Sequence, residues 1–367
     1  MNRFLISTIL LFLFLSCKEE KPDQTIDFVP EKSKPLNIIL MIGDGMGLSQ
    51  ISSTYFYGEK EPNFSRFSTI GLSMTSSSSH KITDSAAGAT AFSTGKKTYN
   101  GAIGVDTNKH VLTSIIELLS EKDYSTGIVS TSSITHATPA SFYAHVDSRK
   151  KEFEIATQLV TSSVDFFAGG GIRFFNERPD SLNYLDSLIT NGFLLDTNSL
   201  SNPITDYNSK YAFLLSPEGL ITKPEGRKDF LINASQKALD YLSKKNNPFF
   251  LMVEGSQIDW GGHANDADYL IQETIDFDKT IGKVLDFAEK DGNTLVIVTA
   301  DHETGGFTLA GKPLVLPLGQ KGDDYNDLDP RFSTGGHSAT LVPVFAFGKG
   351  SELFNGCLLY TSPSPRD

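Results

Sequence analysis

Five short apolar runs, each lying next to small or polar residues, constrain the fold of this chain more than any other feature. The runs are residues 37–42, 125–129, 249–253, 295–298 and 342–347. Unbroken apolar strands of this length are typical of a sheet that is buried on both faces, with helices between the strands. Helical patterns fill several gaps, at residues 113–121, 235–243 and 269–291. The sequence therefore predicts an α/β fold with a largely parallel sheet.

The composition limits the class of protein. The 367 residues are 39% hydrophobic, which excludes a disordered chain and suits one large α/β domain or two modest ones. Asp and Glu number 44 against 32 Lys and Arg, so the net charge is −12 and the chain lacks the basic footprint of a nucleic-acid-binding module. Only two cysteines are present, Cys17 and Cys357, which excludes a disulfide framework.

The first 34 residues have the pattern of an export signal and a tether. Arg3 precedes an apolar run that is too short to span a bilayer, and the run stops at Cys17 in a context that resembles a bacterial lipobox. We expect residues 1–16 to be a lipoprotein signal peptide and Cys17 to carry a lipid that anchors the protein in the cell envelope. A generic signal peptide or a membrane anchor is the alternative. Residues 17–34 are polar and predict a flexible tether.

Residues 357–367 resemble a translated sequencing adapter, so we expect a non-native tail after Gly356. The alternative is a genuine polar terminus. Between the two ends we expect a single domain of residues 35–356. Its part from about 150 to 235 has weaker strand patterns and predicts a variable insertion over the site. Residues 169–171 are three glycines without the Lys-Ser/Thr of a phosphate loop, which favours a tight turn.

Side chains that can bind metal ions gather near the ends of the apolar runs. The candidates are Asp44, Glu254, Asp259, His263, Asp301, His302 and His337. Ligands of open α/β sheets bind at the carboxyl ends of strands, where all of these residues are expected except His337, which precedes its run. Mixed histidine and carboxylate ligands suit Zn²⁺, and an oxygen-rich subset suits Mg²⁺. Each residue alone is equally typical of a turn, an N-cap or a hydrogen-bonded histidine, but their joint position favours a metal site.

Asp259 and His263 are four residues apart, so one helical turn would align them, although the two glycines between them favour a looser helix. Ser85 opens a run of small residues, and a serine at a helix N-terminus lies where free N–H groups can hold a phosphate. Asp84 or Ser85 as a simple N-cap fits the same residues. Arg149, on an expected helix, could form a bidentate pair with phosphate, or could be a solvated surface residue.

Six motifs identify the chain, from about residue 37 to 350, as similar to the alkaline phosphatase family. They are, in the family's order, IGDGMG, TDSAAGATA, THATPASFYAHVDSR, VEGSQIDWGGHAND, TADHETGG and GGHSATLVPVFAFG. The resemblance implies a three-layer α/β sandwich and metal-dependent hydrolysis of phosphate monoesters to an alcohol and inorganic phosphate. It also implies two Zn²⁺ and one Mg²⁺ per chain, and it is compatible with a homodimer.

The resemblance also implies a role for each matching residue. Ser85 is expected to form a phosphoserine, and Arg149 to hold the phosphate. The first zinc site is expected at Asp259, His263 and His337; the second at Asp44, Asp301 and His302; and the magnesium site at Asp44, Thr138 and Glu254. The zinc ions of such two-metal sites lie about 4 Å apart.

Two positions depart from the best-studied bacterial members of the family. His136 stands where those members have Asp, and Trp260 where they have Lys, so we expect both beside the ligands and leave the third metal open between zinc, magnesium and cobalt. Because a tryptophan cannot contact phosphate through water as lysine does, we expect altered phosphate release. Unchanged phosphate inhibition in a Trp260→Lys variant would refute that hypothesis.

The sequence is also compatible with two other functions. A phosphodiesterase of the same superfamily is the nearest, although such enzymes more often use Thr where this chain has Ser85. A lipid-anchored protein that binds metal or phosphate without turnover is the other, although it would be expected to lose Ser85 or Arg149.

Overall fold

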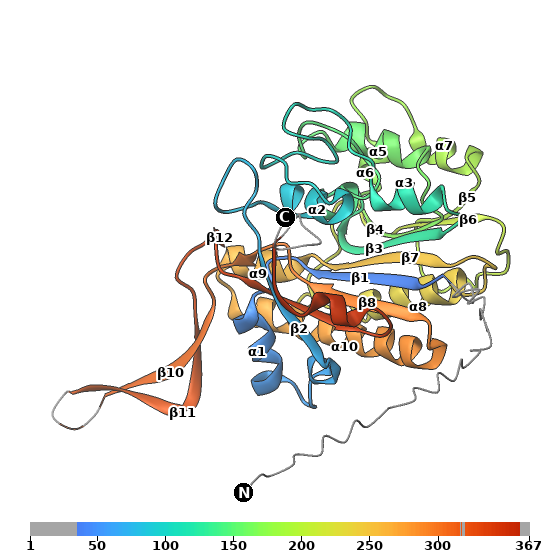
Figure 1. Ribbon diagram of the computed structural model, residues 1–367. Coiled ribbons are helices and arrows are strands. Elements are labelled where there is room, and N and C mark those ends of the chain that lie inside the picture. Colours follow the sequence, from blue (N-terminus) through green and yellow to red (C-terminus); the bar gives the residue numbers. More distant parts are fainter. Residues whose placement is uncertain (1–34, 316, 318–319, 360–367) are drawn as a thin grey trace, which may run out of the picture. The chain divides into compact units, whose positions relative to one another are not determined.

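The structure is a computed structural model that describes residues 35–315, 317 and 320–359 (Figure 1). Its strands are β1 (Asn37–Gly43), β2 (Thr69–Met74), β3 (Ser125–Ser133), β4 (Phe166–Gly170), β5 (Phe193–Asp196), β6 (Lys210–Leu214), β7 (Phe249–Gly255), β8 (Thr294–Thr299), β9 (Glu303–Thr304), β10 (Thr308–Val315), β11 (Lys321–Arg331), β12 (His337–Ser338), β13 (Val342–Phe347) and β14 (Gly356–Leu359). Its helices are α1 (Leu48–Tyr57), α2 (Ser85–Thr94), α3 (Ile115–Ser120), α4 (Ala137–Ala140), α5 (Glu152–Val160), α6 (Arg173–Asn176), α7 (Tyr184–Thr190), α8 (Phe230–Leu242), α9 (Gln257–Ala264) and α10 (Ala267–Asp291), with 3-10 turns η1 (Asn63–Arg66) and η3 (Ser351–Phe354).

The expected signal peptide and tether, with Cys17, lie outside the described residues, as do residues 360–367 of the expected tail. Within the described ranges, every helix is too short or too polar to cross a bilayer.

A ten-stranded sheet forms the centre of the unit from residue 35 onward. The strand order is β14-β2-β13-β8-β1-β7-β3-β4-β6-β5. All neighbours pair in parallel except β13, which runs antiparallel to both β2 and β8. The five apolar runs of the sequence are β1, β3, β7, β8 and β13. The predicted α/β fold with a largely parallel sheet is therefore confirmed.

Helices cover both faces of this sheet, so the unit has three layers (Figure 1). Side chains alternate along β1: Ile39 and Met41 pack in the core that includes α8 and α10, and Leu40 and Ile42 pack in the core that includes α2, α3 and α5. A strand with apolar side chains on both faces needs such a double cover, because either face would otherwise be exposed to water.

The reversed direction of β13 explains the position of His337. The carboxyl ends of β1, β7 and β8 meet at one edge of the sheet, and the start of the antiparallel β13 lies at that same edge. His337 in β12 precedes β13, so it arrives where the other candidates arrive by following their strands. A sequence pattern gives the strand but not its direction, which made His337 look like an exception.

Residues 150–235 are built into the sheet. They supply β4, β6 and β5, which extend the sheet beyond β3, together with α5, α6 and α7. Gly169 and Gly170 end β4, and Gly171 follows in the expected turn with a φ of 98°. Parts of this segment, among them Phe153, Phe174 and Gly219, line one cavity with the candidate residues His136 and Trp260. At the side of the sheet opposite β5, the outermost strand β14 pairs with β2. β14 includes the first residues of the expected non-native tail. Any short apolar stretch can pair with an open edge strand.

Candidate functional site

One edge of the sheet collects every side chain that the sequence singled out. Asp44 follows β1, Glu254 is the second-to-last residue of β7, and Asp301 and His302 follow β8. Asp259 and His263 lie on α9, directly after β7, and Thr138 lies on α4, after β3. Because parallel strands present their carboxyl ends together, residues more than 200 positions apart in the chain become neighbours.

Asp259, His263 and His337 form the first ligand group. Their ligand atoms lie within 4.8 Å of one another, and the two Nε2 atoms of His263 and His337 are 3.1 Å apart. The Nδ1 atom of His263 is 2.8 Å from the carbonyl of Gly335, and that of His337 is 2.9 Å from the carbonyl of Thr83. A carbonyl oxygen only accepts, so each Nδ1 carries the proton and both Nε2 lone pairs face the same point. The two lone pairs repel each other, and a cation bound between them would remove this repulsion.

The helix that carries Asp259 and His263 is regular. α9 runs without interruption through the two glycines, so the expected looser start is wrong. A Cβ at Gly261 would come within 2.7 Å of the backbone of Leu270, and one at Gly262 within 3.0 Å of Thr304. The glycines therefore permit α9 to approach α10 and β9 closely.

Asp44, Asp301 and His302 form the second group, and all three are completely buried. His302 Nε2 is 3.5 Å from Asp44 Oδ1 and 3.3 Å from Asp301 Oδ2. Neither carboxylate oxygen of Asp44 accepts a hydrogen bond. Burial, followed by repulsion from Asp301, raises the pKa of Asp44 well above its usual range, and burial together with Asp259 raises the pKa of Asp301 to about 6. Such a concentration of buried negative charge fits a divalent cation.

The third group contains Asp44, Glu254 and His136. Ser130 donates a hydrogen bond to Glu254 Oε2 at 2.6 Å, and Oε1 has no hydrogen-bond partner. Burial raises the pKa of Glu254 to about 7, whereas burial and the charge of Arg149 lower the pKa of His136 to about 3. A neutral imidazole is the form that binds a metal. The sequence predicts His136 only beside the ligands, whereas the structure places it among them. The buried Thr138, on α4, lies next to Glu254.

Ser85 lies between the second group and Arg149. It is the first residue of α2, and its Oγ is 3.4 Å from His302 Nε2. Asp84 caps the helix by accepting a hydrogen bond from the Ala87 N–H at 3.0 Å, and it also pairs with Arg149 Nη1 at 3.1 Å. Both predictions for this segment are therefore correct: Asp84 is the N-cap, and Ser85 is the first residue of the helix.

The expected helix at Arg149 is wrong, and its side chain is only partly exposed rather than solvated. It lies in the turn before α5, and its side chain is 26% exposed. Its Nη1 faces Asp84 and its Nη2 is 3.1 Å from His136 Nε2. The guanidinium is thus fixed beside Ser85 with donors left for a ligand.

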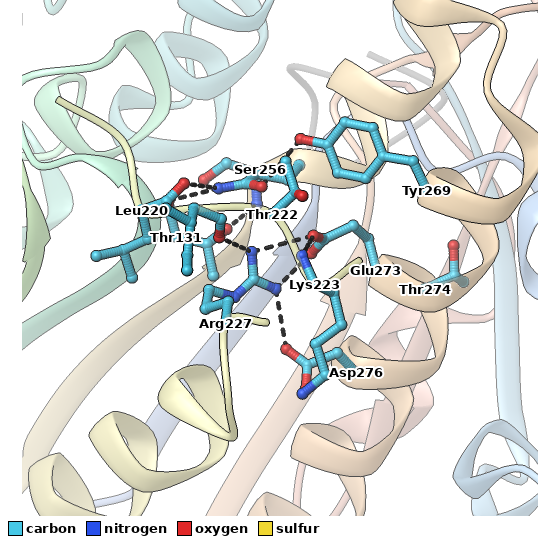
Figure 2. A network of polar contacts seen from close by, with 12 residues as sticks. Thr131, Leu220, Thr222, Lys223, Arg227, Ser256, Tyr269, Glu273, Thr274 and Asp276 are labelled. Carbon is cyan, nitrogen blue, oxygen red and sulfur yellow. Dashed lines mark hydrogen bonds and ion pairs between the residues drawn. The ribbon is translucent and has the colours of Figure 1, made fainter. Parts of the chain in front are cut away.

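Sequence reasoning missed the residues that hold this site together. Thr304 donates to Asp259 Oδ1 at 2.5 Å and lies 3.2 Å from His302 Nδ1, so one hydroxyl links the first two groups. Trp260, by contrast, was expected beside the ligands, and it meets His136 edge to face with ring centroids 6.0 Å apart. A buried ion-pair network around Arg227 lies next to α9 (Figure 2). Thr304 belongs to one of the six motifs, but nothing in the sequence pairs Arg227 with α10.

The arrangement joins one hydroxyl at a helix start, three adjoining groups of metal ligands and one anchored arginine. Divalent cations and arginine stabilise the charge on a transferring phosphoryl group, and a hydroxyl beside a cation is a nucleophile.

Comparisons with known proteins point to one family. The family model described as alkaline phosphatase matches residues 35–328. Alkaline phosphatase 4 of Bacillus subtilis is 35% identical over 325 residues, covering 83% of this chain and 69% of that protein. Alkaline phosphatase of Escherichia coli is 35% identical over 327 residues, covering 72% and 69%. The structure of alkaline phosphatase from the Antarctic bacterium TAB5 is 52% identical with a TM-score of 0.85, covering 90% of this chain and 96% of that chain.

Proposed function

The chain belongs to the alkaline phosphatase family and is a metal-dependent phosphatase, and we propose that it cleaves phosphate monoesters through a phosphoserine on Ser85. The observation that carries this assignment is the position of Ser85. Its hydroxyl lies at the N-terminus of α2, 3.4 Å from His302 of a buried ligand group, and the preceding Asp84 anchors Arg149. Asp84 thereby holds the nucleophile, which follows it in the chain, close to the phosphate clamp, with which it forms an ion pair.

The ligand groups fit two zinc ions and a third cation. The Asp259, His263 and His337 group and the Asp44, Asp301 and His302 group have the mixed nitrogen and oxygen donors that suit zinc, and the Asp44, Thr138, Glu254 and His136 group would hold the third ion. Bound there, the cations supply the positive charge that makes a hydroxyl or water nucleophilic and that neutralises the phosphoryl oxygens.

The chain's own residues carry the substrate through two displacements. Arg149 donates to two phosphoryl oxygens and orients the phosphorus toward Ser85. The Ser85 oxygen loses its proton and forms a bond to phosphorus as the bond from phosphorus to the ester oxygen breaks in line with it, and the ester oxygen takes up a proton and leaves as the alcohol. Because the Asp44 group lies against Ser85, we assign the Asp259 group to the leaving-group side. Water then attacks phosphorus from that side, and phosphate and the free Ser85 hydroxyl are released.

His136 bears on the identity of the third cation. Histidine nitrogen favours zinc, whereas magnesium prefers oxygen ligands only. A structure titled as a TAB5 alkaline phosphatase variant, with one histidine replaced by aspartate, has magnesium bound in its M3 site; it is 52% identical to this chain, with a TM-score of 0.86. We therefore propose that His136 weakens magnesium at this site. Metal analysis after dialysis against equal zinc and magnesium should show more magnesium in a His136→Asp variant than in the wild type.

Hydrolysis of p-nitrophenyl phosphate at alkaline pH tests the assignment. We expect zinc- and magnesium-dependent turnover that is abolished in Ser85→Ala, with the metal content retained. Ser93→Ala is the matched control, because Ser93 is a buried serine on the same helix whose hydroxyl donates to Thr90. Turnover that survives in Ser85→Ala, or a metal-loaded wild type that cleaves bis(p-nitrophenyl) phosphate but no monoester, would overturn the proposal.

We also propose that the mature protein is held in the cell envelope by a lipid on Cys17, after removal of residues 1–16, and that it forms a homodimer. The apolar run that ends at Cys17 in a lipobox-like context supports the anchor. A Cys17→Ser variant should lose incorporation of labelled palmitate and leave the membrane fraction. Sedimentation velocity on a chain without residues 1–17 should give a single dimeric species.

A further inference from the structure

A cavity of about 370 Å³ adjoins the phosphate clamp. Its lining includes His136, Trp260, Lys150, Arg173, Phe174 and Gly219. His136 contacts Arg149, and Lys150 follows Arg149 in the chain, so one side of the cavity borders the arginine that we expect to hold the phosphate. Trp260 directly follows the metal-ligand candidate Asp259 on α9. The cavity therefore adjoins α9, the helix that also carries Asp259 and His263 of the group that we assign to the leaving oxygen.

The walls of the cavity have a definite chemistry. Three aromatic side chains line it: Trp260, and Phe153 and Phe174, which pack edge to face with ring centroids 5.5 Å apart. The guanidinium of Arg173 lies 5.1 Å from the centre of the Phe174 ring, and it pairs with the exposed Glu218. Flat apolar surfaces below a cationic rim suit a planar aromatic group whose far end carries an electron-rich substituent.

A strap made of residues 216–229 forms the remaining wall. A Cβ on Gly219 would come within 2.6 Å of Cη2 of Trp260, so the indole packs directly on the strap backbone. The Leu220 N–H donates to the Thr131 carbonyl at 3.1 Å, and the Gln257 side chain donates to the Leu220 carbonyl at 2.7 Å. These contacts tie the strap to β3 and to the first residue of α9.

A buried ion-pair network fixes the other end of the strap (Figure 2). Arg227 is only 4% exposed and pairs with both Glu273 and Asp276 on α10. Lys223 adds an ion pair to Asp276 at 2.6 Å and a backbone hydrogen bond to Glu273 at 2.8 Å. The wall at Gly219 is thus held in place before any ligand arrives, unlike a free surface loop.

We propose that this cavity is the leaving-group subsite of the enzyme and that it selects aromatic phosphate monoesters over small alkyl ones. The inference rests on the proposed function, because it requires the phosphate to lie on Arg149. An aryl group would enter between Trp260 and the Phe153–Phe174 pair, with its substituent toward Arg173. A methyl ester would reach none of these residues, so its cleavage would depend on the phosphate site alone.

The first experiment compares wild type and Arg173→Ala on p-nitrophenyl phosphate and methyl phosphate, with full metal loading. We expect kcat/KM to fall about fivefold for p-nitrophenyl phosphate, since one cation–π and polar contact is lost. The value for methyl phosphate, and the Ki of inorganic phosphate, should stay within about twofold of wild type. Arg331→Ala is the matched control, because Arg331 is also half exposed and paired with a carboxylate, on the β11 strand away from the cavity. Equal losses on both substrates, or no loss on either, would overturn the proposal.

The second experiment measures binding without turnover. Trp260 is the single tryptophan of the chain, so its fluorescence reports directly on the cavity. Phenylphosphonate should change that fluorescence, and its Kd should rise in Arg173→Ala and in Gly219→Ala. The affinity for methylphosphonate should be the same in both variants as in wild type. That affinity is measured as a Ki, or as a calorimetric Kd if the protein is inactive. If wild type binds phenylphosphonate in this way but cleaves no monoester, the catalytic assignment fails and the subsite stands. If it cleaves monoesters but phenylphosphonate binds no differently in the two variants, the subsite fails alone.

Discussion

Replacing Arg227 by Met should destabilise the protein far more than removing a surface ion pair. The arginine side chain is 3% exposed and faces two carboxylates that are 2% and 0% exposed, on Glu273 and Asp276. Methionine preserves most of the buried volume but leaves the carboxylates without their guanidinium. Asp276 keeps the Lys223 ammonium at 2.6 Å, whereas Glu273 keeps only the Lys223 backbone N–H at 2.8 Å. One buried carboxylate is therefore stranded.

The expected loss follows from that count. Removing one partner of a buried ion pair costs about 3–5 kcal/mol, and because Asp276 remains paired we expect the lower end, about 3 kcal/mol. A double variant, Arg227→Met with Glu273→Met, removes the stranded charge and should recover most of the loss, to within about 1–2 kcal/mol of wild type. Arg331→Met, which breaks an exposed pair with Asp329, should cost less than about 1 kcal/mol.

Urea unfolding at saturating zinc and magnesium measures these differences, and pH provides a second check. Burial raises the pKa of Glu273, and Arg227 opposes that shift. Without Arg227 the folded-state pKa rises further above the unfolded value, so the protonated form is favoured in the fold and stability is lost as pH increases through the folded pKa. The deficit of Arg227→Met relative to wild type should thus be smaller at pH 5 than at pH 8. A deficit that does not change with pH, or a double variant no more stable than Arg227→Met, would refute the reasoning.

Three further predictions concern the site and its supports. Chelation with EDTA should abolish turnover and lower Tm, because the buried ligand groups lose their neutralising cations, and added zinc and magnesium should restore both; a Tm unchanged by EDTA would contradict this. Asp84→Asn keeps the N-cap oxygen but not the charge facing Arg149, so the Ki of inorganic phosphate should rise about threefold to tenfold in inhibition assays, since Arg149 must then be ordered on binding. Ser114→Ala removes half of the capping box of α3 with Glu117 and should cost about 1 kcal/mol in urea unfolding, with kcat unchanged.

The sequence revealed the central strands of the sheet because they are buried on both faces. β1, β3, β7, β8 and β13 all read as unbroken apolar runs. The edge strand β5 and the inner strand β4 did not, since β5 is only four residues long and partly exposed, and β4 ends in two glycines. Helix limits also differed: α10 begins two residues before the predicted residue 269, and α8 begins at Phe230 rather than at 235. Its first turn, at Phe230, packs at the edge of the core without a side-chain cap that could have marked the start.

The ligand groups were predictable because each ligand lies in a short local motif next to a strand end. What could not be predicted was how the motifs meet. His136 N-caps α4, and only the approach of β1 and β7 brings Asp44 and Glu254 to it. The same holds for Arg149, whose surroundings in sequence are the charged residues Lys150 and Lys151 but whose contacts in space are Asp84 and His136. A role in such a site depends on contacts between distant residues, which local patterns do not contain.

The strap illustrates why the residues that shape a substrate site are harder to find than its ligands. The ligands are fixed by the chemistry of the ion, which allows few residue types, whereas a wall needs only the right backbone at the right distance. Gly219 contributes a surface by having no side chain, and Arg227, eight residues later, holds the strap through carboxylates on α10. In sequence these are a glycine after Glu218 and an arginine among charged neighbours, both typical of loops. If the subsite is correct, selectivity among monoesters will follow changes in the strap and in Arg173 while the metal ligands stay the same.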